Sequence, residues 1–196
     1  MSVGGKETEI KLAVRDLAAV RRQLRRLGWR VRVPRSFEQN TLFDTPRSDL
    51  RRRGALLRLR SVAGLHRLTF KGPAGRSAHF KIRQEWETSV DDPAGARRLL
   101  IGLGFAPRFR YEKFRTEFVP RAGQQRGCVM LDETPIGDFL ELEGSQGWIR
   151  GVARELGAAP RDFIARDYTQ LYLDWCRRRG RRPTHMVFPS PRRPRR

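Results

Sequence analysis

The sequence predicts an α+β domain, an antiparallel β-barrel of about eight strands with helices packed on its outside. Three observations support this fold class. Most segments alternate between polar and apolar residues with a period of two, which is typical of strands. The strand-like segments far outnumber the helical ones. Most of the joins between them are short enough for antiparallel pairing, and closing the sheet removes its unpaired edges.

The N-terminal half of the chain alternates between strand and helix signals. Residues 7–14 predict a strand, and Asp16 is expected to cap a helix that ends at Gly28. Asp44 precedes a turn, which we expect it to cap in preference to a catalytic role. Further strands are predicted over 29–33, 37–44, 55–62, 65–71 and 79–90.

The C-terminal half continues this pattern. Asp92 followed by Pro93 predicts the start of a helix that ends at Gly104. Strands are predicted over 108–119, 127–133 and 138–143, and helical segments over 146–156 and 161–177. Residues 1–176 are therefore expected to form one domain. Residues 177–196 are rich in Arg and Pro and are expected to be a disordered tail.

The charge of the chain is strongly positive. The 196 residues carry a formal net charge of +21, and the tail holds nine Arg and no acid, which leaves +12 on the rest. Such a protein attracts polyanions: nucleic acid, an acidic membrane surface or phosphorylated small molecules. The alternative is an Arg-biased composition with solvated faces.

Composition also excludes several classes of protein. No apolar run approaches the roughly 20 residues that cross a bilayer, so we expect no membrane span. The first nine residues lack the apolar core of a signal peptide. Cys128 and Cys176 are too few for a disulfide framework and fit no zinc spacing. The expected location is the cytoplasm.

The charged residues of the predicted strands are sorted by sign. Carboxylates occur on the first and last strands, and Lys and Arg occur on the middle ones. A sheet with one solvated face also alternates, but a face made for solubility would interleave both signs. The opposite faces carry apolar residues that need a cover of helices: Leu56, Leu68, Phe70, Phe80, Trp86, Phe114 and Phe118. We therefore expect the charged faces to point into the barrel.

A lumen with carboxylates on one wall and cations on the other suits a phosphorylated ligand. Arg and Lys neutralise and orient phosphate oxygens. Paired carboxylates hold Mg²⁺ or Mn²⁺, hard ions that also bridge to phosphate. Phosphoryl transfer needs mainly this positioning and charge stabilisation.

The charged series is also similar to a known family. Glu7-Thr8-Glu9-Ile10-Lys11 resembles the Glu-x-Glu-x-Lys signature of the CYTH superfamily, the triphosphate tunnel metalloenzymes. These include class IV adenylate cyclases, thiamine triphosphatases and inorganic triphosphatases. The resemblance spans residues 6–176, and residues 167–171 resemble the closing helix of the family. The ordered series between them runs through Leu57-Arg58-Leu59-Arg60, Thr69-Phe70-Lys71-Gly72-Pro73, Arg83-Gln84-Glu85-Trp86-Glu87, Glu112-Lys113-Phe114-Arg115, Leu131-Asp132 and Gly137-Asp138-Phe139-Leu140-Glu141-Leu142-Glu143.

The resemblance implies a tunnel of antiparallel strands that holds Mg²⁺ or Mn²⁺ and a triphosphate. Lys11 is implied either to bind phosphate or to help activate the nucleophile. The implied metal-side carboxylates are Glu7, Glu9, Asp132, Glu141 and Glu143. The implied triphosphate ligands are Arg58, Arg60, Lys71, Lys113 and Arg115. Additional site residues, or lumenal salt-bridge partners, are Lys81, Arg83, Glu85 and Glu87.

Three functions fit these residues. The favoured one is hydrolysis of a small triphosphate, either inorganic tripolyphosphate or thiamine triphosphate, by a metal-activated water. The second is cyclisation of ATP to cyclic AMP and pyrophosphate, which also needs an adenine pocket that the sequence does not identify. The third is a non-catalytic binder of polyphosphate or nucleic acid, which the lumenal carboxylates would repel. The Arg-rich tail is expected to contact nucleic acid non-specifically.

Overall fold

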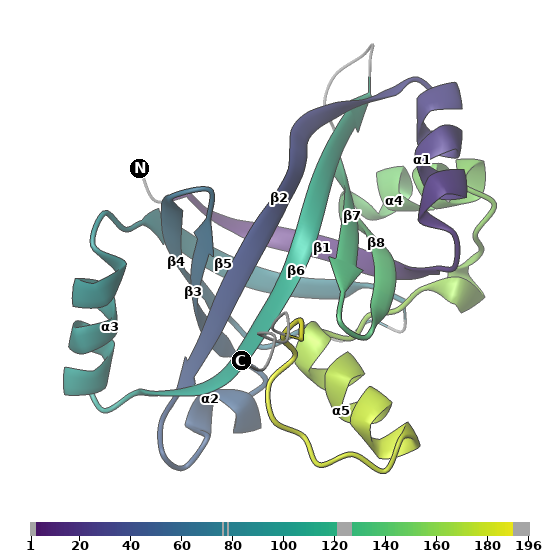
Figure 1. The fold of residues 1–196 in the computed structure, drawn as a ribbon. Helices are drawn as coiled ribbons and strands as arrows, with labels where there is room; N and C mark the ends of the chain where they lie inside the picture. The colour runs from purple at the N-terminus through teal and green to yellow at the C-terminus, as the bar shows by residue number, and fades with distance from the viewer. Residues whose placement is uncertain (1–2, 76, 78, 121–126, 190–196) are drawn as a thin grey trace, which may run out of the picture.

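The computed structural model describes residues 3–75, 77, 79–120 and 127–189. Eight strands close into an antiparallel barrel in the order β1-β5-β4-β3-β2-β6-β7-β8 (Figure 1), which confirms the predicted fold class. The strands are β1 (Val3–Val14), β2 (Trp29–Asp44), β3 (Leu56–Val62), β4 (Leu65–Lys71), β5 (Lys81–Ser89), β6 (Ala106–Pro120), β7 (Gly127–Thr134) and β8 (Gly137–Gly144). The described helices are α1 (Leu17–Arg26), α2 (Asp49–Arg52), α3 (Pro93–Gly102), α4 (Gln146–Glu155) and α5 (Tyr168–Arg178), with a 3-10 turn at Pro160–Asp162.

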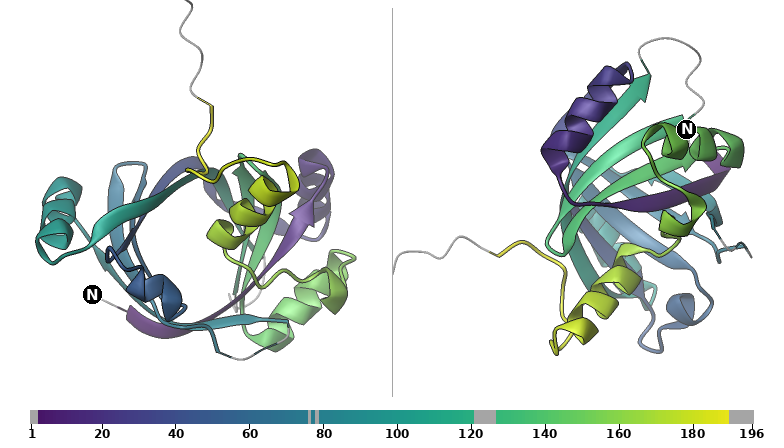
Figure 2. Two further views of the ribbon diagram at one scale, coloured as in Figure 1. Left: turned by 90° about the horizontal axis from the view of Figure 1, so that it is seen from below. Right: turned by 90° about the vertical axis from the view of Figure 1, so that its right-hand side faces the viewer.

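The helices lie outside the barrel wall or at its rim (Figure 2). Leu24 of α1 and Ile149 of α4 are fully buried against the outward apolar residues of β1 and β6 to β8. Burying one such side chain contributes about 1.5–3 kcal/mol. α2 and α5 lie at the same end of the barrel, the lower end in Figure 1. There Tyr172 and Cys176 of α5 pack on Phe109 of β6 in a second apolar cluster.

The predicted helix caps form where the sequence places them. The side chains of Asp16 and Asp92 accept hydrogen bonds from the backbone N–H groups of the residues three positions later. The predicted capping role of Asp44 is also confirmed. Its carboxylate accepts from the N–H groups of Thr45, Leu50 and Arg51, and so organises the short helix α2, for which the sequence predicts no helix.

Two element boundaries differ from the sequence prediction. The segments 29–33 and 37–44 are one continuous strand, β2, whose register with β6 shifts between Val31 and Ser36. These shifts bend the strand and interrupt its alternation, so the two halves resemble separate strands. The last helix starts at Tyr168 and not at 161, because the side chain of Asp167 caps it and Gln170 completes a capping box.

The chain beyond Cys176 is more ordered than its composition predicts. Residues 177 and 178 end α5, and Met186 forms a parallel bridge with Tyr111 of β6 and is fully buried. Phe188 donates its backbone N–H to Glu112. Two apolar side chains anchor this segment, and the prediction of a disordered tail is therefore wrong for residues 177–189. Residues 190–196 lie outside the described residues. None of the described helices is long and apolar enough to cross a bilayer.

Candidate active site

The charged faces of the strands point into the barrel, as the sequence predicts. They enclose a cavity of about 590 Å³. Thirteen of the fifteen predicted site residues line it, and the other two, Asp132 and Arg83, do not. Leu56 was expected on the outer face but also lines the cavity, because it has the same parity along β3 as Arg58 and Arg60.

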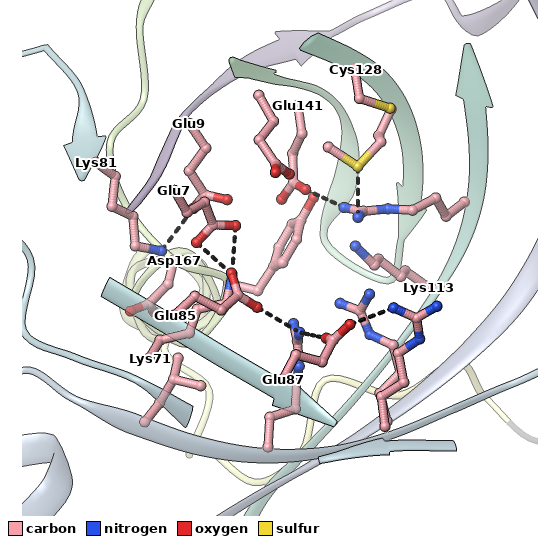
Figure 3. Close-up of a pocket in the computed structure, with 18 of the residues that line it drawn as sticks. Glu7, Glu9, Lys71, Lys81, Glu85, Glu87, Lys113, Cys128, Glu141 and Asp167 are labelled. Carbon is pink, nitrogen blue, oxygen red and sulfur yellow. Dashed lines mark hydrogen bonds and ion pairs between the residues drawn. The ribbon is translucent and has the colours of Figure 1, made fainter. Parts of the chain in front are cut away.

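The acidic wall of the cavity, defined here as Glu7, Glu9, Glu141 and Glu143, comes from β1 and β8. These strands are hydrogen-bonded neighbours, and their register pairs Glu9 with Glu143 and Lys11 with Glu141. The Nζ of Lys11 lies 3.3 Å from Glu9 Oε1 and 3.0 Å from Glu141 Oε1. Figure 3 shows Glu7, Glu9 and Glu141 gathered on one side of the cavity.

Two kinds of carboxylate occur on this wall. Burial raises the pKa of Glu7 to about 7, with the charge of Glu9 adding to the effect and Lys71 opposing it. Burial and the charges of Glu9 and Glu141 likewise raise the pKa of Glu143. Burial alone would also raise the pKa of Glu9, but Lys11 and Lys81 hold it well below its usual range. The wall therefore holds one carboxylate whose charged form is favoured, Glu9, beside two whose neutral forms are favoured, Glu7 and Glu143.

The guanidinium groups of β3 lie across the barrel from the acidic wall, since β3 is remote from β1 and β8 in the strand order. Arg58 donates to Thr69 at 3.2 Å and lies 3.8–3.9 Å from its nearest carboxylates, and its Nε has no partner among the described residues. Arg60 donates to Asn40 at 2.9 Å. Lys71 of β4 lies 2.6 Å from Glu7 and 3.0 Å from Glu85. The donors of Arg58 are therefore only partly satisfied, and the cavity gives them room to bind an oxyanion.

A second cluster of charges is paired mainly among its own members. We call Lys113, Arg115, Asp132 and Tyr168 the paired cluster. Asp132 is fully buried and accepts from Lys113 at 2.8 Å, from Arg115 at 2.6 Å and from the hydroxyl of Tyr168 at 2.6 Å. Arg115 also pairs with Glu141. Asp132 thus orients two cations that line the cavity, but it does not line the cavity itself and does not lie among the carboxylates of the acidic wall.

The remaining additional residues form salt bridges. Lys81 lies 2.9 Å from Glu9, and Glu87 accepts from Thr69 at 2.8 Å and from Arg67 at 2.5 Å. Arg83 lies 3.6 Å from Asp167 and faces a different cavity. The lumenal salt-bridge reading of Lys81 and Glu87 therefore fits their contacts.

The donor set suits a hard divalent cation. The acidic wall offers carboxylate oxygens, which are the ligands that Mg²⁺ and Mn²⁺ prefer. Cys128 also lines the cavity opposite Glu143, but burial raises the pKa of its thiol to about 11, which keeps it protonated and a poor metal ligand. Among the described residues no three acidic, His or Cys side chains already converge on one metal-sized point. The raised pKa values of Glu7 and Glu143 mean that their neutral forms are favoured in the metal-free chain, and a bound divalent cation would favour their charged forms.

Glu38, Tyr111 and Tyr168 are among the lumenal residues that the sequence does not predict. Glu38 is buried 3.5 Å from Arg60 and 3.6 Å from Lys113, and although burial opposes it, these cations hold its pKa far below the usual range. The alternation Glu38-x-Asn40-x-Leu42 could have placed Glu38 in the lumen. It is a weak signal, because it contains one acid and lies next to the register shifts of β2. Tyr111 and Tyr168 line the cavity as aromatic side chains, and the charge pattern carried no signal for them.

Comparison with known proteins identifies the family. The model of the CYTH domain matches residues 5–154. The chain belongs to the CYTH family. A protein of Methanocaldococcus jannaschii that bears the provisional name adenylate cyclase is 30% identical over 139 residues, which cover 71% of this chain and 77% of that protein. This family contains triphosphatases and adenylate cyclases, enzymes that act on triphosphates and generally depend on divalent metal ions.

Solved structures share the barrel. A Vibrio parahaemolyticus protein superposes with a TM-score of 0.74 at 21% identity, over 86% of this chain and 98% of its own. A Pyrococcus horikoshii protein gives 0.70 at 24% identity, over 86% and 98%. A protein from Hippeastrum gives 0.59 at 20% identity, over 90% and 97%. At these identities the likeness supports the fold.

Proposed function

We propose that this protein hydrolyses a small linear triphosphate, inorganic tripolyphosphate or thiamine triphosphate, with Mg²⁺ or Mn²⁺ in the barrel. One observation carries the proposal. The cavity of about 590 Å³ places the acidic wall on β1 and β8 across from Arg58 and Arg60 on β3. A metal at the wall and guanidinium groups opposite it would hold the two sides of a triphosphate chain.

In this proposal the cations and the carboxylates of the cavity have different roles. Arg58, Arg60 and Lys71 would bind and orient phosphate oxygens, and the acidic wall would hold the metal ion. A bound divalent ion would neutralise phosphate oxygens and lower the pKa of a bound water. The chemical step then needs little from the protein beyond this positioning.

Lys11 acts in this proposal as a fixed positive charge. Burial alone would lower its pKa, but Glu141 and Glu9 raise it well above the ordinary value. These two carboxylates favour the protonated form of Lys11, and a protonated lysine binds phosphate oxygens but does not accept a proton. Of its two implied roles, phosphate binding is the one that its surroundings support.

A cyclase is the second candidate, and the name of the Methanocaldococcus relative favours it. The Hippeastrum neighbour, by contrast, is described as having a dominant triphosphatase activity. Both reactions use the same metal and the same cationic side of the lumen. Cyclisation of ATP additionally requires that the ribose 3′-hydroxyl reach the α-phosphorus.

The test is to incubate the protein with Mg²⁺ or Mn²⁺ and with tripolyphosphate, thiamine triphosphate or ATP in separate reactions, and to separate the products by chromatography. We expect phosphate from either of the first two and no cyclic AMP from ATP. Arg60→Ala should raise KM for the active substrate by about 10-fold or more, whereas Arg47→Ala, an exposed arginine outside the cavity, should not. Cyclic AMP with pyrophosphate would instead establish the cyclase, and no turnover of any substrate would reject both.

A further inference from the structure

A second cavity lies at the end of the barrel where α2 and α5 sit. Its volume is about 500 Å³, and it takes its walls from α2, α5, the ends of β2 and β6, and residues 183–184. Leu42, Leu56, Asp167 and Thr169 line both cavities, so the two are adjacent and meet at these side chains. The proposed function makes no use of this space.

Arg83 is the unusual residue of the second cavity. It comes from β5, lines the cavity and is only 7% exposed. Its Nε and Nη1 have no hydrogen-bond partner among the described residues. Its nearest carboxylate oxygen, Asp167 Oδ2, lies 3.6 Å from Nη2, which is beyond a hydrogen bond. A buried guanidinium with unmet donors is costly, and an oxyanion would satisfy it.

The other charged groups of this cavity leave it positive. Arg51 and Arg108 are exposed and line it together with Arg83. The acids are Asp44 and Asp167, and both oxygens of Asp44 already accept backbone N–H groups. Asp167 uses Oδ1 to cap α5. Three guanidinium groups against two carboxylates, one of them fully engaged, favour an anion with more than one negative charge.

We propose that the second cavity binds a phosphate-class oxyanion, with Arg83 as its buried ligand and Arg51 and Arg108 as exposed ones. The anion fits between the guanidinium groups as a multiply charged acceptor. If the proposed hydrolysis is correct, phosphate released beside Leu42 and Leu56 would reach this site next, and the site would serve product release. That use rests on the proposed function, whereas the binding itself does not.

The test follows the guanidinium of Arg83 directly and needs no turnover. In metal-free protein labelled with ¹⁵N-arginine, the Nε–Hε NMR signal of Arg83 is assigned by its loss in Arg83→Lys or, if that variant does not fold, in Arg83→Gln. Inorganic phosphate is then titrated in the presence of EDTA. We expect a saturable shift of this signal, and a Kd that rises about 3- to 5-fold in Arg108→Ala but stays unchanged in Arg47→Ala.

Each further outcome decides the matter. Persistence of the shift in Lys71→Ala, which alters only the main cavity, would show that the anion binds at the second cavity itself, and its loss there would overturn the proposal. A signal that does not move when phosphate saturates the protein would also overturn it. So would an equal shift with acetate, or an equal weakening by Arg47→Ala. Failure of triphosphate hydrolysis with an intact Arg83 shift would reject the proposed function and leave this site standing.

Discussion

The acidic wall and the paired cluster bury similar groups in opposite ways. In the paired cluster, Asp132 is fully buried yet accepts from two cations and one hydroxyl. On the acidic wall, Glu7 and Glu143 are pushed toward their neutral forms by burial and by other carboxylates. The first arrangement is complete within the protein. The second holds two carboxylates whose neutral forms are favoured, and a bound cation would favour their charged forms.

From this difference we expect the paired cluster to contribute mainly to stability and the acidic wall mainly to metal binding. Removing one member of a closed buried ion cluster leaves a charge without a partner. Removing a carboxylate from a crowded group relieves repulsion. The following experiments test that division, beginning with the largest expected effect.

Asp132→Asn should destabilise the protein most. It leaves Lys113 and Arg115 buried with much less compensating charge, a loss of about 3–5 kcal/mol in the free energy of unfolding. Urea denaturation of wild type and variant measures it. Glu143→Gln is the matched control on the acidic wall, and it should leave the free energy of unfolding unchanged or slightly higher. Equal losses in the two variants would contradict the division.

The double variant Glu7→Gln, Glu143→Gln should keep its stability but lose metal-dependent activity. Loss of two metal-side oxygen ligands should reduce metal-dependent turnover by about 10- to 100-fold. The apparent affinity for Mg²⁺ should fall, as measured by a metal titration of triphosphate hydrolysis. Glu117→Gln is the control, because Glu117 lines the cavity but is paired with Arg32. An unaltered metal titration curve in the double variant would remove these two residues from the metal site.

The stability of the metal-free protein should fall as the pH rises from about 4.5 to 7. Glu7 has a pKa of about 7 in the folded chain and an ordinary value of 4.5, so between these values the folded state holds a proton that the unfolded state has released. Stability therefore decreases through this window, by roughly 3 kcal/mol, and the full loss is present above it. Glu143 contributes with the same sign.

Urea denaturation in EDTA at several pH values measures this dependence, and Glu7→Gln should flatten it. Glu9 and Glu141 have pKa values well below the ordinary one, so their contribution changes only at lower pH. A profile that keeps its slope in Glu7→Gln would show that other groups cause it.

The contrast also explains what the sequence could predict. A period of two sorts the side chains of a strand between lumen and exterior, so it predicts the lumenal position of most of the carboxylates and cations, with Asp132 and Arg83 outside the main cavity. Leu56 lines the cavity although its apolar character predicts the outer face, because its parity along β3 matches that of Arg58. Glu38 was missed because the register shifts in β2 hide its alternation.

The sequence pattern does not predict contacts between segments that are far apart in the chain. Asp132 looks like one more acid of a lumenal strand, and only the folded barrel shows that Tyr168 and two cations occupy its oxygens. The Arg and Pro content of the C-terminal segment predicts disorder, but Met186 and Phe188 anchor residues 177–189 to the barrel. Composition describes a segment by its average, whereas docking depends on a few side chains.

Tyr168→Phe should have the smallest effect and gives the sharpest test of the paired cluster. It removes only the hydroxyl that donates to Asp132 at 2.6 Å and keeps the ring, which lies 5.0 Å from Lys11 Nζ and 5.2 Å from Lys113 Nζ. Asp132 loses one of its partners but keeps both cations, so the expected loss in stability is about 1–2 kcal/mol. Urea denaturation measures it, with Tyr172→Phe as control because that hydroxyl makes only longer contacts near Thr184.

Combining Tyr168→Phe with Asp132→Asn should give less than the sum of the two single losses, since both act on one hydrogen bond. Additive losses would mean that Tyr168 stabilises the protein independently of Asp132, and the paired cluster would then not be one unit.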